Sequence, residues 1–264
     1  MAEFGAKDVK ALRDATGAGM MDAKRALEEN NGDQEAAAKW LREQGIVKSA
    51  ARTDRENTQG SVAIATIGNA AALVELKSET DFTAKSDNFV AMVQRLADAV
   101  LEDGEGAIDS LKDAVDDLKI TTKENIEVGK VARLEAEDGQ VLDTYLHKQE
   151  GRGVNGVLVV LNGGDAELAH ALALHIAFAK PKFLSRDEVP ADAIAAEREQ
   201  LEAMTRNEGK PEQAIPKIVE GRVNAWIADQ TLIEQKMIPD EKEPVEKALG
   251  AASVDRFVQA VIGA

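Results

Sequence analysis

The spacing of apolar residues along this chain changes near residue 60. Before that point, apolar side chains recur every three or four positions, as they do on the buried face of an amphipathic helix. Three short helices are predicted within residues 7–45, separated by glycine-containing breaks at residues 16–19 and 30–32. The polar segment at residues 49–59 has only alanines to bury, so it is predicted to be a linker.

After residue 60, short apolar runs bounded by turn residues predict β-strands. Two hairpins are predicted: residues 61–67 with 71–76 around Gly68-Asn69, and residues 128–135 with 140–147 around Asp138-Gly139. A loop at residues 148–155 is expected to lead to a buried strand at residues 157–161. Because helices and strands both occur along the chain, the pattern predicts an α+β fold.

Amphipathic helices are expected at about residues 86–102, 108–118 and 166–179. Both halves of the core then follow one order, in which strands lead to a buried strand, a polar turn and a helix. We interpret this order as an internal duplication of two subdomains, each of which buries one face of a sheet. The turns at the two equivalent corners differ, because only the first one, Thr80-Asp81-Phe82, carries an aromatic residue.

Residues 191–228 contain two narrow apolar stripes on either side of a turn at residues 207–211. Their flanks are charged, so this segment is predicted to be a projecting helical hairpin. Further short helix or strand signals follow at residues 245–249 and 257–262.

The composition sets limits on what the chain can be. Its 264 residues are 44% apolar and contain 3% aromatics, which is enough for two compact domains with aliphatic cores. Cysteine does not occur, which excludes disulfides and thiolate chemistry. No apolar stretch approaches the ~20 residues that span a bilayer, and the N-terminus does not resemble a secretory signal, so a cytoplasmic location is expected.

The charge is strongly acidic and unevenly placed. The formal net charge of −16 arises entirely after residue 55, because the first 55 residues carry equal numbers of acidic and basic side chains. An acidic chain gains nothing from releasing the counterions of nucleic acid, and anionic membranes repel it. We therefore expect a protein or small-molecule partner, with no direct nucleic-acid or membrane binding.

The residues that could support catalysis or metal binding do not form a recognisable set. His170 and His175 are five positions apart, which does not place them on one helix face as metal ligands. The glycine turns match neither a phosphate-binding loop nor a dinucleotide fingerprint. No pairing of a nucleophile with a base is evident. The sequence therefore predicts no catalytic residue, no metal site and no cofactor.

Phe82 stands out because it lies at a strand-to-helix corner that ought to be solvated. Thr80 and Asp81 are suitable cap residues for the helix that follows, and Phe82 falls in its first turn, off the face that is later buried. The residues alone leave two interpretations open. Phe82 either folds back onto its own helix as a hydrophobic staple or inserts into the core of a partner.

Two long motifs favour the second interpretation. The segment Leu12-Arg13-Asp14-Ala15-Thr16-Gly17-Ala18-Gly19-Met20-Met21-Asp22-Ala23-Lys24-Arg25-Ala26-Leu27 resembles the N-terminal motif of the bacterial elongation factor Ts family. The segment Glu75-Leu76-Lys77-Ser78-Glu79-Thr80-Asp81-Phe82-Thr83-Ala84-Lys85 resembles the second motif of that family, with Thr83 where the family usually has valine. Similar stretches continue in the right order through most of the chain, although the C-terminal segment departs from the usual pattern.

The resemblance implies a guanine-nucleotide exchange factor that acts on elongation factor Tu, in both its GDP-bound and nucleotide-free states. The corner would disturb the Mg²⁺ and phosphate site of Tu through Thr80, Asp81, Phe82 and Thr83, with Phe82 as the wedge. The N-terminal module would grip the partner through Leu12, Arg13, Thr16, Gly17, Gly19 and Met20. His147 would belong to a further contact region in the second half of the core.

The resemblance also completes the expected organisation. A three-helix, UBA-like module at residues 1–48 and a linker at 49–59 would precede a core N-subdomain at 60–127. The core C-subdomain would comprise residues 128–190 and 229–264, interrupted by the hairpin at 191–228. Two other functional classes are weighed against the exchange factor: a non-catalytic adaptor or chaperone-like docking protein, and an acidic ligand-binding enzyme, for which no convergent polar pocket is evident.

Overall fold

The computed structural model describes residues 4–50, 52–238 and 242–263. Three helices come first: α1 (Ala6–Thr16), α2 (Met20–Glu29) and α3 (Gln34–Ala50). They enclose a small core of buried aliphatic residues, namely Val9, Leu12, Ala23, Ala26, Leu27, Ala37 and Leu41. The helical module that the sequence predicted is therefore present, with a longer third helix than expected.

The described strands form two three-stranded antiparallel sheets. The first sheet has the order β1 (Gln59–Ile67), β2 (Ala70–Ser78), β3 (Glu127–Glu135). The second has the order β4 (Gln140–Gln149), β5 (Arg152–Asn162), β6 (Ser253–Val261). With helices on these sheets, the α+β class is confirmed.

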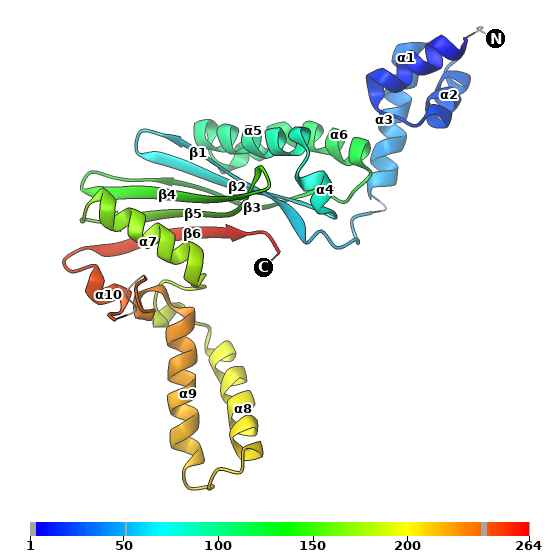
Figure 1. The fold of residues 1–264 in the computed structure, drawn as a ribbon. Helices are drawn as coiled ribbons and strands as arrows, with labels where there is room; N and C mark the ends of the chain where they lie inside the picture. The colour runs from blue at the N-terminus through cyan, green and yellow to red at the C-terminus, as the bar shows by residue number, and fades with distance from the viewer. Residues whose placement is uncertain (1–3, 51, 239–241, 264) are drawn as a thin grey trace.

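The two sheets lie face to face, and each is covered on its other face by helices (Figure 1). Along β2, Leu73 faces the second sheet, whereas Val74 faces the helices. Along β5, Leu158 faces the first sheet, whereas Val159 faces α7 (Ala166–Ala179). Because both faces of these central strands are covered, their sequences are almost continuously apolar.

The helices on the first sheet follow β2 in the chain. They are the one-turn α4 (Asp81–Ala84), then α5 (Asp87–Asp103), the 3-10 helix η1 (Glu105–Leu111) and α6 (Lys112–Thr122). Phe89, Val93, Leu96 and Val100 of α5 are buried against the sheet. Ser86 caps α5, and Thr80 caps only α4. The expectation that Thr80 and Asp81 cap the long helix is therefore wrong, because the short α4 ends before α5 begins.

The sheets approach each other closely where β1 meets β5. A Cβ atom at Gly153 would lie 2.1 Å from the backbone oxygen of Val62, so only glycine fits there. The turn before it is also tight. β4 and β5 are joined through Glu150 and Gly151, both with positive φ, and the loop expected at residues 148–155 is wrong.

The predicted pairing of residues 128–135 with 140–147 is wrong as well. β3 pairs with β2, and β4 pairs with β5, so the Asp138-Gly139 turn carries the chain from one sheet to the other. The physical reason is that β2 offers β3 an open edge next to a covered core. The division of the sheets consequently falls between β3 and β4, whereas the sequence placed the start of the second half at residue 128.

The chain after α7 forms an element that projects from the core. The 3-10 helix η2 (Arg186–Glu188) leads to α8 (Ala191–Asn207) and α9 (Ile215–Gln230), which pack as an antiparallel pair extending from the core (Figure 1). The expected helical hairpin is confirmed. The chain returns through η3 (Leu232–Glu234) and α10 (Val245–Ala248) to β6, in agreement with the signals in the tail.

Candidate partner-binding site

Phe82 lies on α4 with 85% of its surface exposed. Around the ring, Ser78 ends a covered strand, and Ala84 of the same helix packs into the core of the first sheet. The ring therefore does not fold back onto its own helix, and the staple interpretation is wrong. A large apolar side chain in water at a packed corner is the feature that a partner could bury.

The corner is held from within by Thr80. Its hydroxyl oxygen accepts a hydrogen bond from the amide of Thr83 at 3.2 Å, which caps the first turn of α4. Thr83 itself is 7% exposed, so its side chain belongs to the interior of the corner. Of the four motif residues, Thr80, Asp81 and Phe82 are exposed, and only Thr83 is buried.

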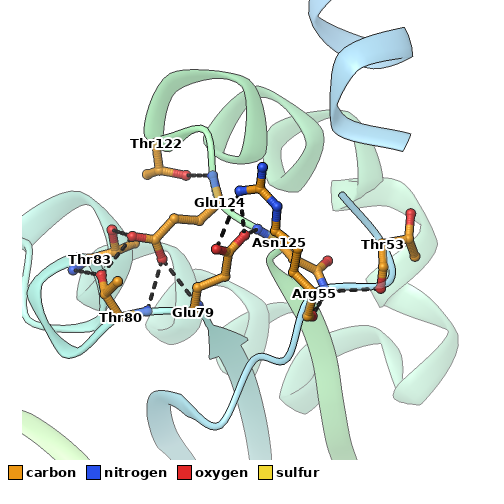
Figure 2. Close-up of polar contacts among 8 residues, drawn as sticks. All are labelled: Thr53, Arg55, Glu79, Thr80, Thr83, Thr122, Glu124 and Asn125. Carbon is orange, nitrogen blue, oxygen red and sulfur yellow. Dashed lines mark hydrogen bonds and ion pairs between the residues drawn. The ribbon is translucent and has the colours of Figure 1, made fainter. Parts of the chain in front are cut away.

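A carboxylate from another part of the chain also binds the corner (Figure 2). Glu124, just beyond α6, accepts hydrogen bonds from the hydroxyls of Thr80 and Thr83, each at 2.6 Å. The same carboxylate accepts hydrogen bonds from the backbone amides of Glu79 and Thr80, at 3.1 and 3.2 Å. The corner is thereby attached to the segment that precedes β3.

A second set of contacts joins these segments to the chain before β1 (Figure 2). Glu79 accepts a hydrogen bond from the backbone amide of Asn125 at 2.6 Å. The buried side chain of Asn125 donates to the carbonyl oxygens of Thr53 and Arg55, at 3.2 and 2.8 Å. The corner is therefore bonded to both neighbouring segments of the first half of the core.

Charged side chains surround the exposed part of the corner. Lys85 donates to Asp81 at 2.6 Å and also forms an ion pair with Glu150, in the turn between β4 and β5. The hydrogen bond from Lys85 and its charge lower the pKa of Asp81 below its ordinary value. Asp81 is therefore an anion at neutral pH, held beside the exposed ring.

Beside these ion pairs lies an open polar hollow of about 500 Å³, lined in part by Asp81, Lys85 and Arg152. Arg152 is 7% exposed and donates to the carbonyl oxygen of Gly60 and to the side chain of Gln59. These bonds connect the start of β5 to the start of β1, so the floor of the hollow joins the two sheets.

In the N-terminal module, the predicted site residues divide into core and surface. Leu12 is 2% exposed and lies in the small core, so its side chain is not available on this surface. Met20 and Met21 are 46% and 70% exposed at the start of α2. Gly17, with φ of +67°, ends α1 in the left-handed conformation that favours glycine, and Gly19 precedes α2.

Two further residues complete this surface. The hydroxyl of Thr16 donates to the carbonyl oxygen of Leu12 at 2.6 Å, which closes the last turn of α1. Arg13 forms an exposed ion pair with Asp14. The module contacts the core through α3 and α6, where Arg42 forms ion pairs with Asp113 and Asp117.

The three histidines lie on β4 and α7. His147 is exposed on β4, opposite Asn155 of β5. His170 is exposed on α7 and lies 3.0 Å from Asp143, whereas His175 is 1% exposed in the same helix. His170 is therefore a surface side chain and His175 a packed one.

Sequence reasoning missed the residues that support the corner, notably Glu124, Glu79, Asn125 and Glu150. No local pattern marks Glu124, because its partners lie more than 40 positions earlier in the chain. The contact of Lys85 with Asp81 could have been predicted, because Lys85 lies four positions after Asp81 and oppositely charged residues at this spacing meet on a helix surface.

Two absences hold for the part of the chain that the structure describes. No group of three or more His, Cys, Asp or Glu side chains there is arranged to hold a metal ion. None of the helices described is long and apolar enough to cross a membrane.

Comparison with known proteins places this arrangement in a family. The family described as "Elongation factor TS" matches residues 79–264. The elongation factor Ts of Clavibacter michiganensis is 42% identical, and that of a Nocardioides species 44% identical, each over the full length of both chains. The corresponding protein of Deinococcus radiodurans is 42% identical over 98% of this chain and 99% of its own. This chain belongs to the elongation factor Ts family.

Proposed function

We propose that Phe82 is the wedge through which this member of the elongation factor Ts family releases GDP from elongation factor Tu. The family implies nucleotide exchange on Tu as the activity. The observation that supports the wedge is the 85% exposure of Phe82 on a corner whose neighbouring residues are all bonded or buried. Tu would bury this ring beside its nucleotide site.

The wedge acts by differential binding. Fully burying a phenylalanine side chain contributes roughly 1.5–3 kcal/mol, about ten- to a hundredfold in an equilibrium constant. An exchange factor accelerates release only if it binds the nucleotide-free state of Tu more tightly than the GDP-bound state. By linkage, bound GDP lowers the affinity of Tu for the exchange factor by the same factor as the exchange factor lowers the affinity of Tu for GDP. Other contacts must therefore add to that of Phe82.

Asp81 is proposed to act next to the ring. Its carboxylate is exposed and ionised, so it can repel or compete for groups around the Mg²⁺ and phosphates of Tu. Thr80 and Thr83 are proposed to contribute by holding the corner, because their hydroxyls are already engaged with Glu124.

The N-terminal module is proposed to supply affinity. Met20, with Met21 beside it, offers an exposed apolar surface next to the turn formed by Gly17 and Gly19. Thr16 and the exposed part of Arg13 lie at the same end of α1, and Leu12 supports them from the core. His147 is proposed to contact a second region of Tu from β4.

The finer organisation is part of the proposal. We propose a UBA-like module at 1–48, a linker at 49–59, core subdomains at 60–127 and at 128–190 with 229–264, and a hairpin at 191–228. An origin of the two sheets with their helices by duplication is supported by their shared layering, helices outside and sheets facing each other. The placement of β3 in the first sheet argues for a later boundary, between β3 and β4.

The proposed activity needs neither a covalent step nor a cofactor, because GDP leaves Tu unchanged. We propose that the protein acts in the cytoplasm on GDP-bound and nucleotide-free Tu, without binding nucleic acid or membrane directly. The acidic net charge of −16 supports this choice of partner. An adaptor without exchange activity is the alternative that the experiment below separates.

The test measures release of fluorescent GDP from Tu at increasing concentrations of the Phe82→Ala variant. We expect a maximal rate about ten- to a hundredfold lower, with unchanged circular dichroism, because an exposed side chain contributes little to folding. Ile67→Ala is the control, since Ile67 is 65% exposed at the opposite end of the β1–β2 hairpin. Wild-type exchange by Phe82→Ala would remove the ring from the mechanism, and binding without acceleration by the wild-type protein would identify an adaptor.

A further inference from the structure

We infer that Glu124 is a positioning residue for Phe82, holding the corner in the shape that presents the ring. The inference rests on the proposed role of Phe82 as a wedge. Glu124 lies outside both motifs that carry the family resemblance, and it contacts the corner only through the fold. Its carboxylate reaches Glu79, Thr80 and Thr83, which flank Asp81 and Phe82 on both sides.

Both oxygens of the Glu124 carboxylate accept hydrogen bonds from the corner. Oε1 accepts from the two threonine hydroxyls, and Oε2 accepts from the two backbone amides. An ionised carboxylate has only acceptor sites, about four of them, and therefore matches four donors. The two O–H···O distances of 2.6 Å are in the range of hydrogen bonds to a charged acceptor. A neutral amide of the same size cannot satisfy all four donors.

The corner depends on such a contact because α4 is only one turn long. A single helical turn fixes several backbone angles for very few internal hydrogen bonds, so it is unstable by itself. Glu124 bonds to the residue before α4 and to the residue after Phe82. The backbone that carries the ring is therefore fixed at both ends, and the ring is left outside.

Glu124 is itself held in place. Lys123, with φ of +62°, ends α6 in a left-handed conformation that turns the chain toward the corner. The contact is then reciprocal (Figure 2). The Glu124 carboxylate accepts a hydrogen bond from the backbone amide of Glu79. The Glu79 carboxylate in turn accepts one from the backbone amide of Asn125, the residue after Glu124. Two segments more than 40 residues apart are thus joined as a pair, each capping the backbone of the other.

A general effect on stability would give a different result from a positioning effect. If Glu124 only stabilised the fold, its removal would reduce the amount of folded protein and lower all Tu binding. If Glu124 positions Phe82, its removal would lower the maximal exchange rate and spare the affinity supplied by the N-terminal module. The two effects of Glu124 and Phe82 would then also overlap, because both act through one ring.

The test uses the full chain with Glu124→Gln and Tu loaded with fluorescent GDP. We expect a maximal exchange rate about tenfold lower, with a half-saturating concentration close to that of the wild type, since hydrogen bonds to a charged group are the ones lost. Thr83→Val removes one of the four donors without changing the size of the side chain, and a smaller decrease is expected. Glu105→Gln is the control, because Glu105 also accepts a distant backbone amide, that of Arg133.

The double variant Glu124→Gln with Phe82→Ala separates positioning from stability. We expect it to exchange GDP at the rate of Phe82→Ala alone. Additive losses in the double variant would overturn the inference, because Glu124 would then act independently of the ring. Should Glu124→Gln fold poorly, Glu124→Asp retains the charge on a shorter side chain, and its maximal rate is expected to fall below that of the wild type; an unchanged rate would overturn the inference.

Two outcomes distinguish the inference from the proposed function. Wild-type exchange by folded Glu124→Gln, while Phe82→Ala is slow, would overturn the positioning role and leave the wedge intact. Wild-type exchange by Phe82→Ala would overturn the wedge and the positioning role together.

Discussion

The ammonium group of Lys85 lies 2.6 Å from the carboxylate of Asp81, one helical turn earlier in the chain. The same ammonium pairs with Glu150 of the second sheet. Lys85 therefore connects the anion beside Phe82 to the turn between β4 and β5, and both halves of the core contribute to the charge around the exposed ring.

The first prediction concerns the ionisation of Asp81. Lys85 holds the pKa of Asp81 below its ordinary value, so Lys85→Met is expected to raise it toward that value. The contribution of the pair to stability is present at neutral pH and is lost as the pH falls through the pKa of Asp81 in the folded state. Titration of the Asp81 side chain by carbon-detected NMR measures the shift. Lys112→Met, which breaks an equivalent pair with Asp116, should leave the Asp81 curve unchanged.

The second prediction concerns the contact between α3 and α6. A Cβ atom at Gly45 would lie 2.7 to 3.0 Å from three side-chain atoms of Ile120. We expect Gly45→Ala to push α3 away from α6 and so to tilt the N-terminal module relative to the core. The altered module should bind Tu more weakly, which is measured as a higher half-saturating concentration in the exchange assay.

Gly221 provides the matched comparison, since a Cβ atom there meets no heavy atom within 4 Å among the described residues. Gly221→Ala in α9 should stabilise the protein by about 0.5–1 kcal/mol in urea unfolding, through helix propensity alone. An equal gain from Gly45→Ala would show that Ile120 moves aside without cost.

The third prediction concerns His175, whose pKa burial lowers below its ordinary value. Its Nε2 lies 3.0 Å from Gln235 Oε1, and the amide of Ile238 donates to Nδ1 at 3.4 Å. These partners fit the neutral ring with its proton on Nε2, because a second proton on Nδ1 would face the Ile238 amide.

The unfolded chain therefore binds a proton at His175 more readily than the folded protein does. Its contribution to stability is present above about pH 6.5, the ordinary value for histidine, and is lost as the pH falls toward the pKa in the folded state. His175→Gln keeps a donor toward Gln235 and removes the titration, so urea unfolding should depend less on pH below that value. Identical slopes for the wild type and His175→Gln would contradict the assignment.

The fourth prediction separates the core and surface of the N-terminal module. Leu12→Ala removes a buried side chain and should destabilise the module by about 2–5 kcal/mol, seen as faster amide exchange in α1 to α3. Met20→Ala should leave amide exchange unchanged and raise the half-saturating concentration for Tu, because Met20 is exposed. The opposite assignment of the two effects would show that Leu12 contacts the partner directly.

Local patterns predicted much of the fold. The Gly68-Asn69 turn and the apolar runs on either side predicted the β1–β2 hairpin, and the helix expected at residues 166–179 coincides with α7. These signals succeed because hydrogen bonds within a turn or a cap involve near neighbours in the chain. For Phe82, the same periodicity left the staple and the partner-binding interpretations open, and the 85% exposure of the ring decides between them.

Features that depend on distant contacts could not be predicted in this way. Asp138-Gly139 has the composition of a hairpin turn, yet the edge of β2 captures β3 and the turn crosses between sheets. Thr80 caps only the one-turn α4, where its hydroxyl and that of Thr83 bind Glu124, and the long helix begins at a separate cap, Ser86. Nothing near Glu124 in the sequence indicates those partners.

The base of the α8–α9 hairpin has a consequence for how this protein can be altered. The chain leaves the second sheet beside the point where it returns, since Phe183 bridges to Thr231 and the amide of Leu232 bonds to the carbonyl of Phe183. An arm whose two ends meet can be lengthened, shortened or exchanged for a foreign module without altering the path of the strands. Elongation factors of this design could thus acquire new attachments through a single insertion point.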